Sequence, residues 1–340
     1  MCLYPKLVSN PKYRKNKKNG GNIPKVKDPR VLMVPIGCGK CIECTKKRAR
    51  EWQARLHQEL KTNRNALFVT LTFSNESLRE LYRLTPELEG YDLENETAVK
   101  AMRRFLERWR KKYGKSVRHW FVTELGSGDT ERLHLHGILW TDKGLEEIKD
   151  RWQYGHVWIG QYCNERTINY MVKYVHKVDE VHKEYKSRIL CSQGIGRSYV
   201  ESTAKRRNSY REAETNTTYK TSQGHKIGLP IYYRNYLYTE EEREKLWLYT
   251  LDKEERWVLG QKISVANGEE EYYATLKHAR EKNKRLGFGD DSINWERRRY
   301  ERNKRKLLKL GKIWGNRKAL AEQAISHSQK ADKRTGKYEN

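Results

Sequence analysis

The sequence predicts an α+β fold in which a central antiparallel β-sheet is flanked by helices. Two observations carry this prediction. Strand-like and helix-like segments are interleaved between residues 61 and 180, and two of the strand-like segments flank a glycine-rich turn. Strands joined by a short turn pair antiparallel, and interleaved helices cover the sheet. The rest of the chain is expected to form an N-terminal cysteine-rich module and a basic, largely helical C-terminal region.

Four segments have the composition of β-strands. Residues 67–73 alternate and are rich in β-branched and aromatic side chains, which predicts a strand with two different faces. Residues 119–125 and 133–140 flank a turn that contains Gly126 and further small or polar residues, and this predicts an antiparallel hairpin. Residues 155–161 predict one more short strand.

Three segments show helical periodicity. Apolar residues recur at steps of three and four in residues 45–61, 97–113 and 167–177, and Gly114 follows the second segment as a stop signal. Arginine and lysine fill the other faces of the first two helices. Such faces are usually only solvated, but in a chain this cationic we favour contacts with phosphates.

The charge balance points to a polyanionic partner. The 340 residues contain 71 Lys and Arg against 44 Asp and Glu, a formal net charge of +27, which suits nucleic acid. No apolar run approaches the roughly 18 residues of a membrane-spanning helix, and the N-terminus lacks the apolar stretch of a signal peptide. We therefore expect a soluble intracellular protein without a membrane partner.

The chain divides into three predicted parts. Residues 1–60 form a cysteine-rich segment with a basic helix, residues 61–185 form the α+β domain, and residues 186–340 form an accessory region with a basic tail. Residues 297–318 of this tail contain eleven basic residues and one acid. Three aromatic residues lie in or beside it: Trp295, Tyr300 and Trp314. Such a tail either stacks on unpaired bases or stays disordered.

Three cysteines, Cys38, Cys41 and Cys44, form a CxxCxxC run. In a reducing compartment such clustering favours a metal over disulfides. Cys2 is a candidate fourth ligand of a tetrahedral structural Zn²⁺ site, and His57 competes with it for that place. An iron–sulfur cluster uses similar ligands. The alternative is a set of reduced cysteines without metal.

His134 and His136 alternate along the predicted strand 133–140, so their rings project from one face with Cα atoms about 7 Å apart. Glu124 lies on the preceding strand of the hairpin. Two imidazoles and a carboxylate suit Mg²⁺ or Mn²⁺ and leave coordination positions open for phosphate oxygens. An isolated pair of alternating histidines is nevertheless more often without function.

Tyr170 and Tyr174 lie one turn apart on the predicted helix 167–177, and Lys173 and Lys177 share their face. The opposite face is apolar. A phenol has a pKa of about 10, so it needs a neighbouring cation or a metal-polarised target to attack at neutral pH. The alternative is that these residues only pack amphipathically, with lysine side chains reaching to solvent.

In this order, three segments resemble the motifs of the HUH endonuclease superfamily of rolling-circle initiators: FVTLTF at 68–73, LHLHGI at 133–138 and YMVKY at 170–174. Three further segments resemble the replication initiation proteins of microviruses, in their gokushovirus branch: MCLYP at 1–5, CGKCIEC at 38–44 and LPIYY at 229–233. The resemblance covers most of residues 1–240.

This resemblance implies an origin-specific, metal-dependent nickase and ligase of single-stranded DNA with an HUH-type sheet. It implies three ligands for the Mg²⁺ or Mn²⁺ ion: His134, His136 and Glu124. Tyr170 and Tyr174 become the nucleophiles, which form a 5′-phosphotyrosine intermediate and leave a 3′-hydroxyl. Lys173 then orients or neutralises the phosphate between them.

The implied partners are the replication origin of single-stranded phage DNA and the host helicase and polymerase, in the cytoplasm of the infected bacterium. The chain has no GxxxxGK[ST] motif, so we do not expect it to be its own helicase. Two alternatives remain. One is a relaxase or transposase of the same superfamily, and the other is a non-catalytic zinc-containing DNA-binding protein.

Overall fold

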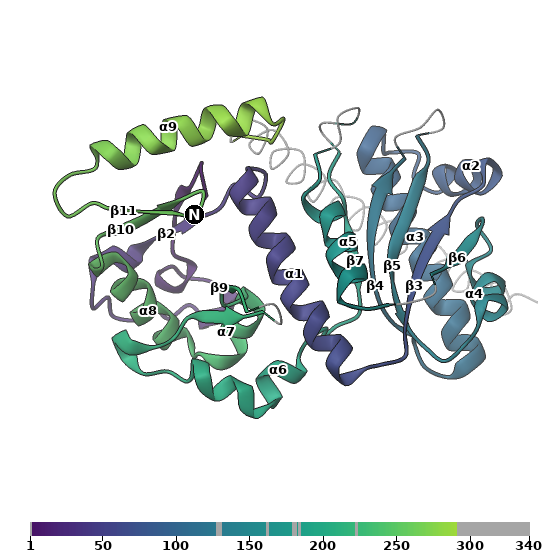
Figure 1. Ribbon diagram of the computed structural model, residues 1–340, viewed down its shortest axis with the longest axis horizontal. Helices are drawn as coiled ribbons and strands as arrows, with labels where there is room; N and C mark the ends of the chain where they lie inside the picture. Colours follow the sequence, from purple (N-terminus) through teal and green to yellow (C-terminus); the bar gives the residue numbers. More distant parts are fainter. Residues whose placement is uncertain are drawn as a thin grey trace, which may run out of the picture. The chain divides into compact units, whose positions relative to one another are not determined.

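A five-stranded antiparallel β-sheet with helices on both faces confirms the predicted α+β class (Figure 1). The computed structural model describes residues 2–126, 131–160, 163–178, 182, 185–221 and 224–290. Across the sheet the strands follow one another in this order: β6 (Val157–Ile159), β3 (Ala66–Thr72), β5 (Leu133–Trp140), β4 (Arg118–Leu125) and β7 (Ile189–Cys191). The predicted hairpin is β4 and β5, which pair over their whole length.

The register of the sheet brings the predicted metal ligands together. His134 is opposite Thr72 on β3 and opposite Glu124 on β4, while His136 is opposite Thr70. Directly opposed residues in paired strands project from the same face. Glu124, His134 and His136 therefore share one face of the sheet.

Two apolar clusters cover the two faces of the sheet. Three helices cover one face: α2 (Asn75–Arg83), α3 (Gly90–Tyr113) and α4 (Leu145–Trp152). Two helices cover the other face: α1 (Ile42–Thr62) and α5 (Glu165–His176). Trp120, Ile138 and Met171 are fully buried in this second cluster. The histidine pair therefore lies on the face that α5 covers.

Helix α3 is longer than the predicted segment 97–113. Its first two turns are polar, which hides the helical periodicity, but Asn95 there is buried and its Oδ1 accepts a hydrogen bond of 3.0 Å from the Thr123 hydroxyl. A tertiary partner thus replaces the apolar contacts from which a helix is normally recognised. The predicted strand 155–161 is shortened to β6, and its residue 161 lies outside the described residues.

The N-terminal segment packs with residues far along the chain. The hairpin β1 (Lys6–Ser9) and β2 (Met33–Ile36) precedes α1, and the later hairpin β10 (Glu255–Val258) and β11 (Gln261–Ser264) precedes α9 (Glu270–Arg285). Leu3, Cys41 and Ile42 share one buried cluster with Val258 and Leu276. The cysteine-rich segment and the accessory region therefore build a common core, and the three-part division remains a prediction.

A fourth cluster contains the remaining helices and one hairpin. They are α6 (Ser198–Glu201), α7 (Ile231–Leu237), α8 (Glu240–Asp252), β8 (Thr218–Lys220) and β9 (Lys226–Gly228). Single 3₁₀ turns complete the chain: Pro11–Tyr13, Lys17–Asn19, Pro29–Leu32, Thr203–Asn208 and Glu212–Glu214. The accessory region thus mixes helices with short hairpins. The basic tail at 297–318, with Trp295, Tyr300 and Trp314, lies outside the described residues.

Helix α1 lies between the sheet and this fourth cluster, to which it contributes Leu56 and Ala54 respectively. Arg55 is enclosed between the rings of Trp52 and Tyr232, each with its centroid 4.0 Å from the guanidinium carbon. At this position the basic face of the helix is used for packing rather than for phosphate contacts. Among the helices of the described residues, none has the length and apolar composition needed to cross a bilayer.

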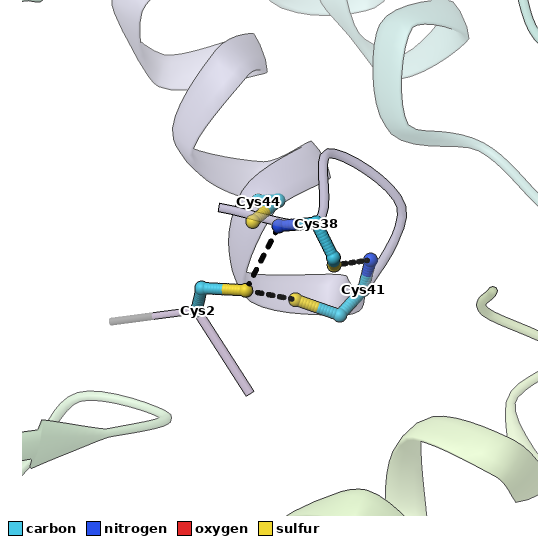
Figure 2. Close-up of side chains that lie close together, drawn as sticks. All are labelled: Cys2, Cys38, Cys41 and Cys44. Atoms are coloured by element: carbon cyan, nitrogen blue, oxygen red, sulfur yellow. Dashed lines mark hydrogen bonds between the residues drawn. The ribbon is translucent and has the colours of Figure 1, made fainter. Parts of the chain in front are cut away.

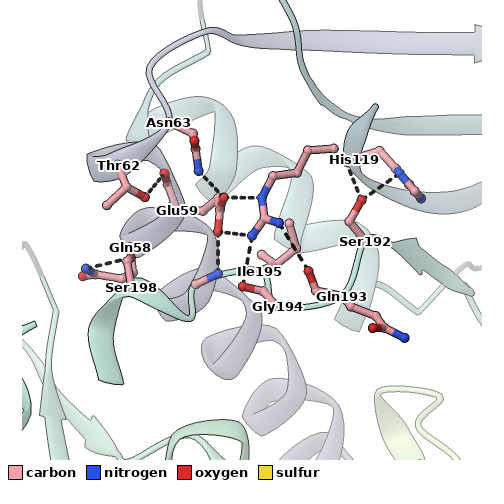
Figure 3. Close-up of polar contacts among 12 residues, drawn as sticks. Gln58, Glu59, Thr62, Asn63, His119, Ser192, Gln193, Gly194, Ile195 and Ser198 are labelled. Atoms are coloured by element: carbon pink, nitrogen blue, oxygen red, sulfur yellow. Dashed lines mark hydrogen bonds and ion pairs between the residues drawn. The ribbon is translucent and has the colours of Figure 1, made fainter. Parts of the chain in front are cut away.

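A buried carboxylate fastens α1 to the sheet (Figure 3). Glu59 is 2% exposed and accepts hydrogen bonds from the Arg118 guanidinium, at 2.5 and 2.9 Å, and from the backbone N–H of Gly196 at 2.6 Å. Gly196 has φ +75°, and a Cβ there would lie 2.7 Å from the Arg55 carbonyl oxygen. The close approach therefore requires glycine at this turn.

Candidate active site and cysteine cluster

His136 is held from both sides of its ring. Its Nε2 lies 2.9 Å from a carboxylate oxygen of Glu124, and its Nδ1 lies 3.1 Å from the Thr70 hydroxyl. Glu124 comes from β4 and Thr70 from β3, the two strands that flank β5. The sheet register thus fixes the orientation of this imidazole, as outer partners do for histidine ligands in metal sites.

His134 lies beside His136, with ring centroids 6.2 Å apart and an interplanar angle of 25°. Burial lowers the pKa of His134, and the neighbouring His136 lowers it further. A neutral imidazole is the form that binds a metal ion. His134 is therefore kept in the form that a ligand requires.

The three predicted ligands do not form a closed metal site. Within the part of the chain that the structure describes, only the cysteine cluster brings three or more ligand atoms within 4.8 Å of one another. Glu124 instead contacts His136 and Lys177. These contacts keep the carboxylate on the histidine face of the sheet, where a cation can replace the Lys177 ammonium.

Helix α5 brings both predicted tyrosines to the histidine pair. The ring of Tyr174 stacks on that of His136, and the Tyr174 hydroxyl donates a hydrogen bond of 2.5 Å to the Tyr170 hydroxyl. Burial raises the pKa of Tyr174, and this hydrogen bond raises it further. Tyr170 is 48% exposed. The opposite face of the helix is buried against the sheet through four residues: Ile168, Met171, Val172 and Val175.

The lysine nearest to these groups is Lys177 rather than Lys173. The Lys177 ammonium lies 3.3 Å from a Glu124 oxygen and 6.0 Å from the centre of the Tyr174 ring. Lys173 is exposed on the same helix and, among the described residues, makes no ion pair with Glu124 and no ring contact with Tyr174. Its role at the phosphate remains a prediction.

Two site residues on β3 escape the motif reasoning. Thr70 bonds to His136, and Phe68 lies edge-on to Tyr170 with ring centroids 6.4 Å apart. Both belong to the first resembling motif, and their alternation places them on one face of the strand. That alternation was the available signal, but the pairing of β3 with β5 was needed to show which face it is.

Four cysteine side chains converge at the start of α1 (Figure 2). The four sulfur atoms, those of Cys2, Cys38, Cys41 and Cys44, all lie within 4.8 Å of one another. Backbone N–H groups point at them: that of Cys38 donates to Cys2 Sγ at 3.2 Å, and that of Leu3 donates to Cys41 Sγ at 3.5 Å. Cys2, and not His57, is therefore the fourth member of the cluster.

The electrostatics of these thiols suit a cation. Hydrogen bonds, first of all with Cys2, lower the pKa of Cys38 and lower that of Cys41 to about 7. The pKa of Cys2 and that of Cys44 are raised, because their protons are held by the neighbouring sulfurs. Only some of the four can ionise without a positive charge among them. Four thiolates at this spacing fit a tetrahedral Zn²⁺ ion.

Helix α9 supports the cluster from outside. The Asn283 side chain is buried and accepts a 2.8 Å hydrogen bond from the backbone N–H of Ile42, at the first turn of α1. The Arg280 guanidinium donates to the Leu3 carbonyl oxygen at 2.9 Å. The residues on both sides of the cysteines are thus fixed by one helix.

Comparison with known proteins places the central part of the chain in a family. Residues 66–179 match a family model that describes replication-associated proteins of the ORF2 type. The chain is also 23% identical over 232 residues to the replication-associated protein ORF4 of Chlamydia phage 1, an alignment that covers 60% of this chain and 53% of the relative. The chain therefore spans about half the length of the curated relative that it matches. No solved structure matches the chain.

The matched segment coincides with the site. It begins at the first residue of β3 and ends shortly after α5, so it contains Thr70, the β4–β5 hairpin and both tyrosines. The cysteine cluster and α9 lie outside it. Residues 66–179 thus form a domain of the ORF2 family of replication-associated proteins, which confirms the resemblance to a replication initiator of the microvirus type.

Proposed function

We propose that this protein initiates rolling-circle replication as a metal-dependent, origin-specific nickase and ligase of single-stranded DNA. The observation that carries the proposal is the stacking of Tyr174 on His136, which puts two hydrogen-bonded phenols beside two imidazoles and a carboxylate. Within a domain of a replication-associated family, these groups are the ones that transesterification of a phosphodiester needs.

Mg²⁺ or Mn²⁺ would be held by His134, His136 and Glu124. These donors fit such an ion because one imidazole is kept neutral by burial and the carboxylate lies on the open side of the sheet. When bound, the ion supplies Lewis-acid polarisation of a phosphate oxygen. The Thr70 hydroxyl would keep the His136 ring oriented during binding.

The proposed reaction exchanges one phosphate ester for another. A tyrosine Oη attacks phosphorus and loses its proton, and the bond from phosphorus to the 3′ oxygen breaks. The products are a 5′-phosphotyrosine link and a free 3′-hydroxyl. Lys173, exposed on the same helix, and Lys177, beside Tyr174, would offset the negative charge that develops on the phosphate.

Two tyrosines allow two successive transfers. After the first has cleaved and holds the 5′ end, the second can cleave the regenerated origin, and the released 3′-hydroxyl can then displace the first linkage. The proposed partners are phage origin DNA, to which the net charge of +27 is suited, and the host helicase and polymerase. The reaction would take place in the cytoplasm of the infected bacterium.

A covalent-adduct assay tests the proposal. Single-stranded oligonucleotides that tile the replicon encoding this chain are labelled at the 5′ or the 3′ end and incubated with the protein and Mn²⁺. On a denaturing gel we expect a shortened 5′-labelled product and a 3′-labelled DNA–protein adduct. The Tyr170→Phe, Tyr174→Phe double variant should form neither.

Two controls make the assay decisive. Tyr273→Phe, on α9, changes a tyrosine that is 58% exposed and should cleave normally. DNA binding without an adduct at any tile, in wild type and with Mn²⁺ present, would contradict the nickase and favour a non-catalytic DNA-binding protein. An adduct that persists in the double variant would assign the linkage to another residue.

A further inference from the structure

Trp158 is a large apolar side chain that the core does not use. It lies on β6, the edge strand of the sheet, and is 50% exposed. In the register, Trp158 is opposite Thr70, and Thr70 is in turn opposite His136. The indole is therefore in the same cross-strand row as the candidate active-site histidine and projects from the same face of the sheet.

Aromatic rings connect Trp158 to the candidate nucleophile. The indole meets the Phe68 ring edge-on, with centroids 5.5 Å apart, and Phe68 meets Tyr170 edge-on at 6.4 Å. We call Trp158, Phe68 and Tyr170 the aromatic shelf. Phe68 is partly buried against the sheet cluster, whereas both ends of the shelf are about half exposed.

Gly160 allows these rings to pack. A Cβ at this position would lie 2.9 Å from the Phe68 ring and 3.1 Å from the Trp158 ring, closer than ordinary contacts. The indole therefore rests over a backbone without a side chain. Its orientation follows from local packing, so the exposed ring presents a fixed surface rather than a freely rotating one.

Cations flank the exposed end of the shelf. On α5, Arg166 lies one turn before Tyr170 and Lys173 lies almost one turn after it, and both are exposed. A phosphate at the Tyr170 hydroxyl would be within the field of these charges. The base attached to the neighbouring sugar would then lie toward an exposed aromatic face, which is the combination found where proteins bind single strands.

We infer that the aromatic shelf stacks one unpaired nucleobase of the DNA strand, next to the phosphate that Tyr170 engages. The inference rests on the proposed function for the identity of that phosphate. Stacking accepts any base, because each has a π-face. Bases in a duplex are already stacked on their neighbours, so the shelf would favour single-stranded over double-stranded DNA without reading sequence.

Equilibrium binding tests this inference without any cleavage. The full chain is titrated against a fluorescein-labelled oligo(dT) of about 20 nucleotides in EDTA, with fluorescence anisotropy as the readout. Trp158→Ala should weaken binding by about 5-fold or more, the usual effect of losing one stacking platform. Trp158→Phe should retain most of the affinity.

The matched control is Trp257→Ala. Trp257 is 45% exposed on β10, outside the sheet that carries the site, so its loss should leave binding unchanged. The salt dependence separates stacking from charge. Trp158→Ala should keep the wild-type slope of log K against log salt, because no phosphate contact is lost, whereas Lys173→Ala should flatten it. Binding to duplex DNA of the same length should be equal for wild type and Trp158→Ala.

Wild-type affinity for oligo(dT) in Trp158→Ala, or equal loss in Trp257→Ala, would overturn the inference. So would an equal loss on duplex DNA. If Trp158→Ala does not fold, a second measurement on the unaltered protein decides: oligo(dT) carrying 5-iododeoxyuridine should photocrosslink to the peptide with Trp158, and crosslinking only elsewhere contradicts the shelf.

The shelf and the nickase can fail separately. If wild type forms no covalent adduct but Trp158→Ala binds oligo(dT) more weakly, the stacking surface stands and the proposed chemistry falls. If the adduct forms and Trp158→Ala binds like wild type, the chemistry stands and the stacking surface falls.

Discussion

The ring of Tyr174 lies parallel to that of His136, with centroids 4.8 Å apart and an interplanar angle of 7°. This contact joins α5 to the β5 strand and sets the distance between the candidate nucleophile and the candidate metal ligands. Because the apolar face of α5 is buried against the sheet, the helix cannot rotate without losing this stacking. The spacing of the two groups is therefore set by packing.

Removal of the Thr70 hydroxyl should weaken metal binding without unfolding the domain. Thr70→Val keeps the size of the side chain but loses the hydrogen bond to His136 Nδ1. Loss of such an outer partner typically reduces metal affinity or activity by about 10- to 100-fold, which Mn²⁺ titration followed by electron paramagnetic resonance can measure. Thr72→Val is the matched control, since the Thr72 hydroxyl bonds to backbone atoms of His156 instead. Equal affinity in both variants would mean that His136 is not a ligand.

The two tyrosines should differ in the first cleavage. Tyr174 donates its hydroxyl proton toward Tyr170, and a donated hydrogen bond stabilises the phenolate of the acceptor. The pKa of Tyr174 is itself raised, first by burial. We therefore expect Tyr170→Phe to abolish the first adduct, and Tyr174→Phe to cleave but fail to transfer the strand onward. The reverse pattern in single-turnover gels would make Tyr174 the first nucleophile.

The cysteine cluster should contain one tightly bound Zn²⁺ ion per chain. Cys2→Ser removes one of the four thiolates within 4.8 Å, so elemental analysis should find less zinc, and the midpoint of thermal unfolding should fall. Cys163→Ser changes a cysteine outside this cluster and should leave the zinc content unchanged. Purified wild type that contains neither zinc nor iron would contradict the prediction.

Breaking the buried ion pair of Glu59 should destabilise the fold. In Glu59→Gln the Arg118 guanidinium loses its charged partner in a site that is almost closed to solvent. Removing one member of a buried pair typically lowers the free energy of unfolding by about 3 kcal/mol, measurable by urea denaturation. The exposed pair of Arg197 and Glu201 is the comparison, and Glu201→Gln should have little effect. Equal effects of the two variants would mean that burial does not set the strength of the Glu59 contact.

Acid should destabilise the metal-free protein partly through His134. Burial lowers the pKa of this imidazole in the folded state, so between that pKa and the ordinary value of about 6.5 the unfolded chain binds the extra proton. Stability therefore falls as the pH drops through this window. His134→Asn should lose less stability than wild type between about pH 7 and pH 5 in urea denaturation. An identical loss in both proteins would exclude this contribution.

Local patterns were enough to predict the sheet and the helix that carry the site. Alternation predicted the β4–β5 hairpin, and the apolar stripe from Ile168 to Val175 predicted which face of α5 is buried. These properties depend on residues close together in the sequence. The start of α3 was missed because Asn95 takes its hydrogen bond from Thr123, a residue on another element.

The sequence by itself determined the α+β class, the alternating histidines, the two tyrosines one turn apart and the CxxCxxC run. Only the tertiary structure decided that Lys177 is the lysine beside Glu124, that Cys2 rather than His57 completes the cysteine cluster, and that Trp158 shares a row with His136. The physical reason is range. Periodicity reports which face of one element is buried, whereas register, helix docking and the return of a distant segment depend on contacts between elements.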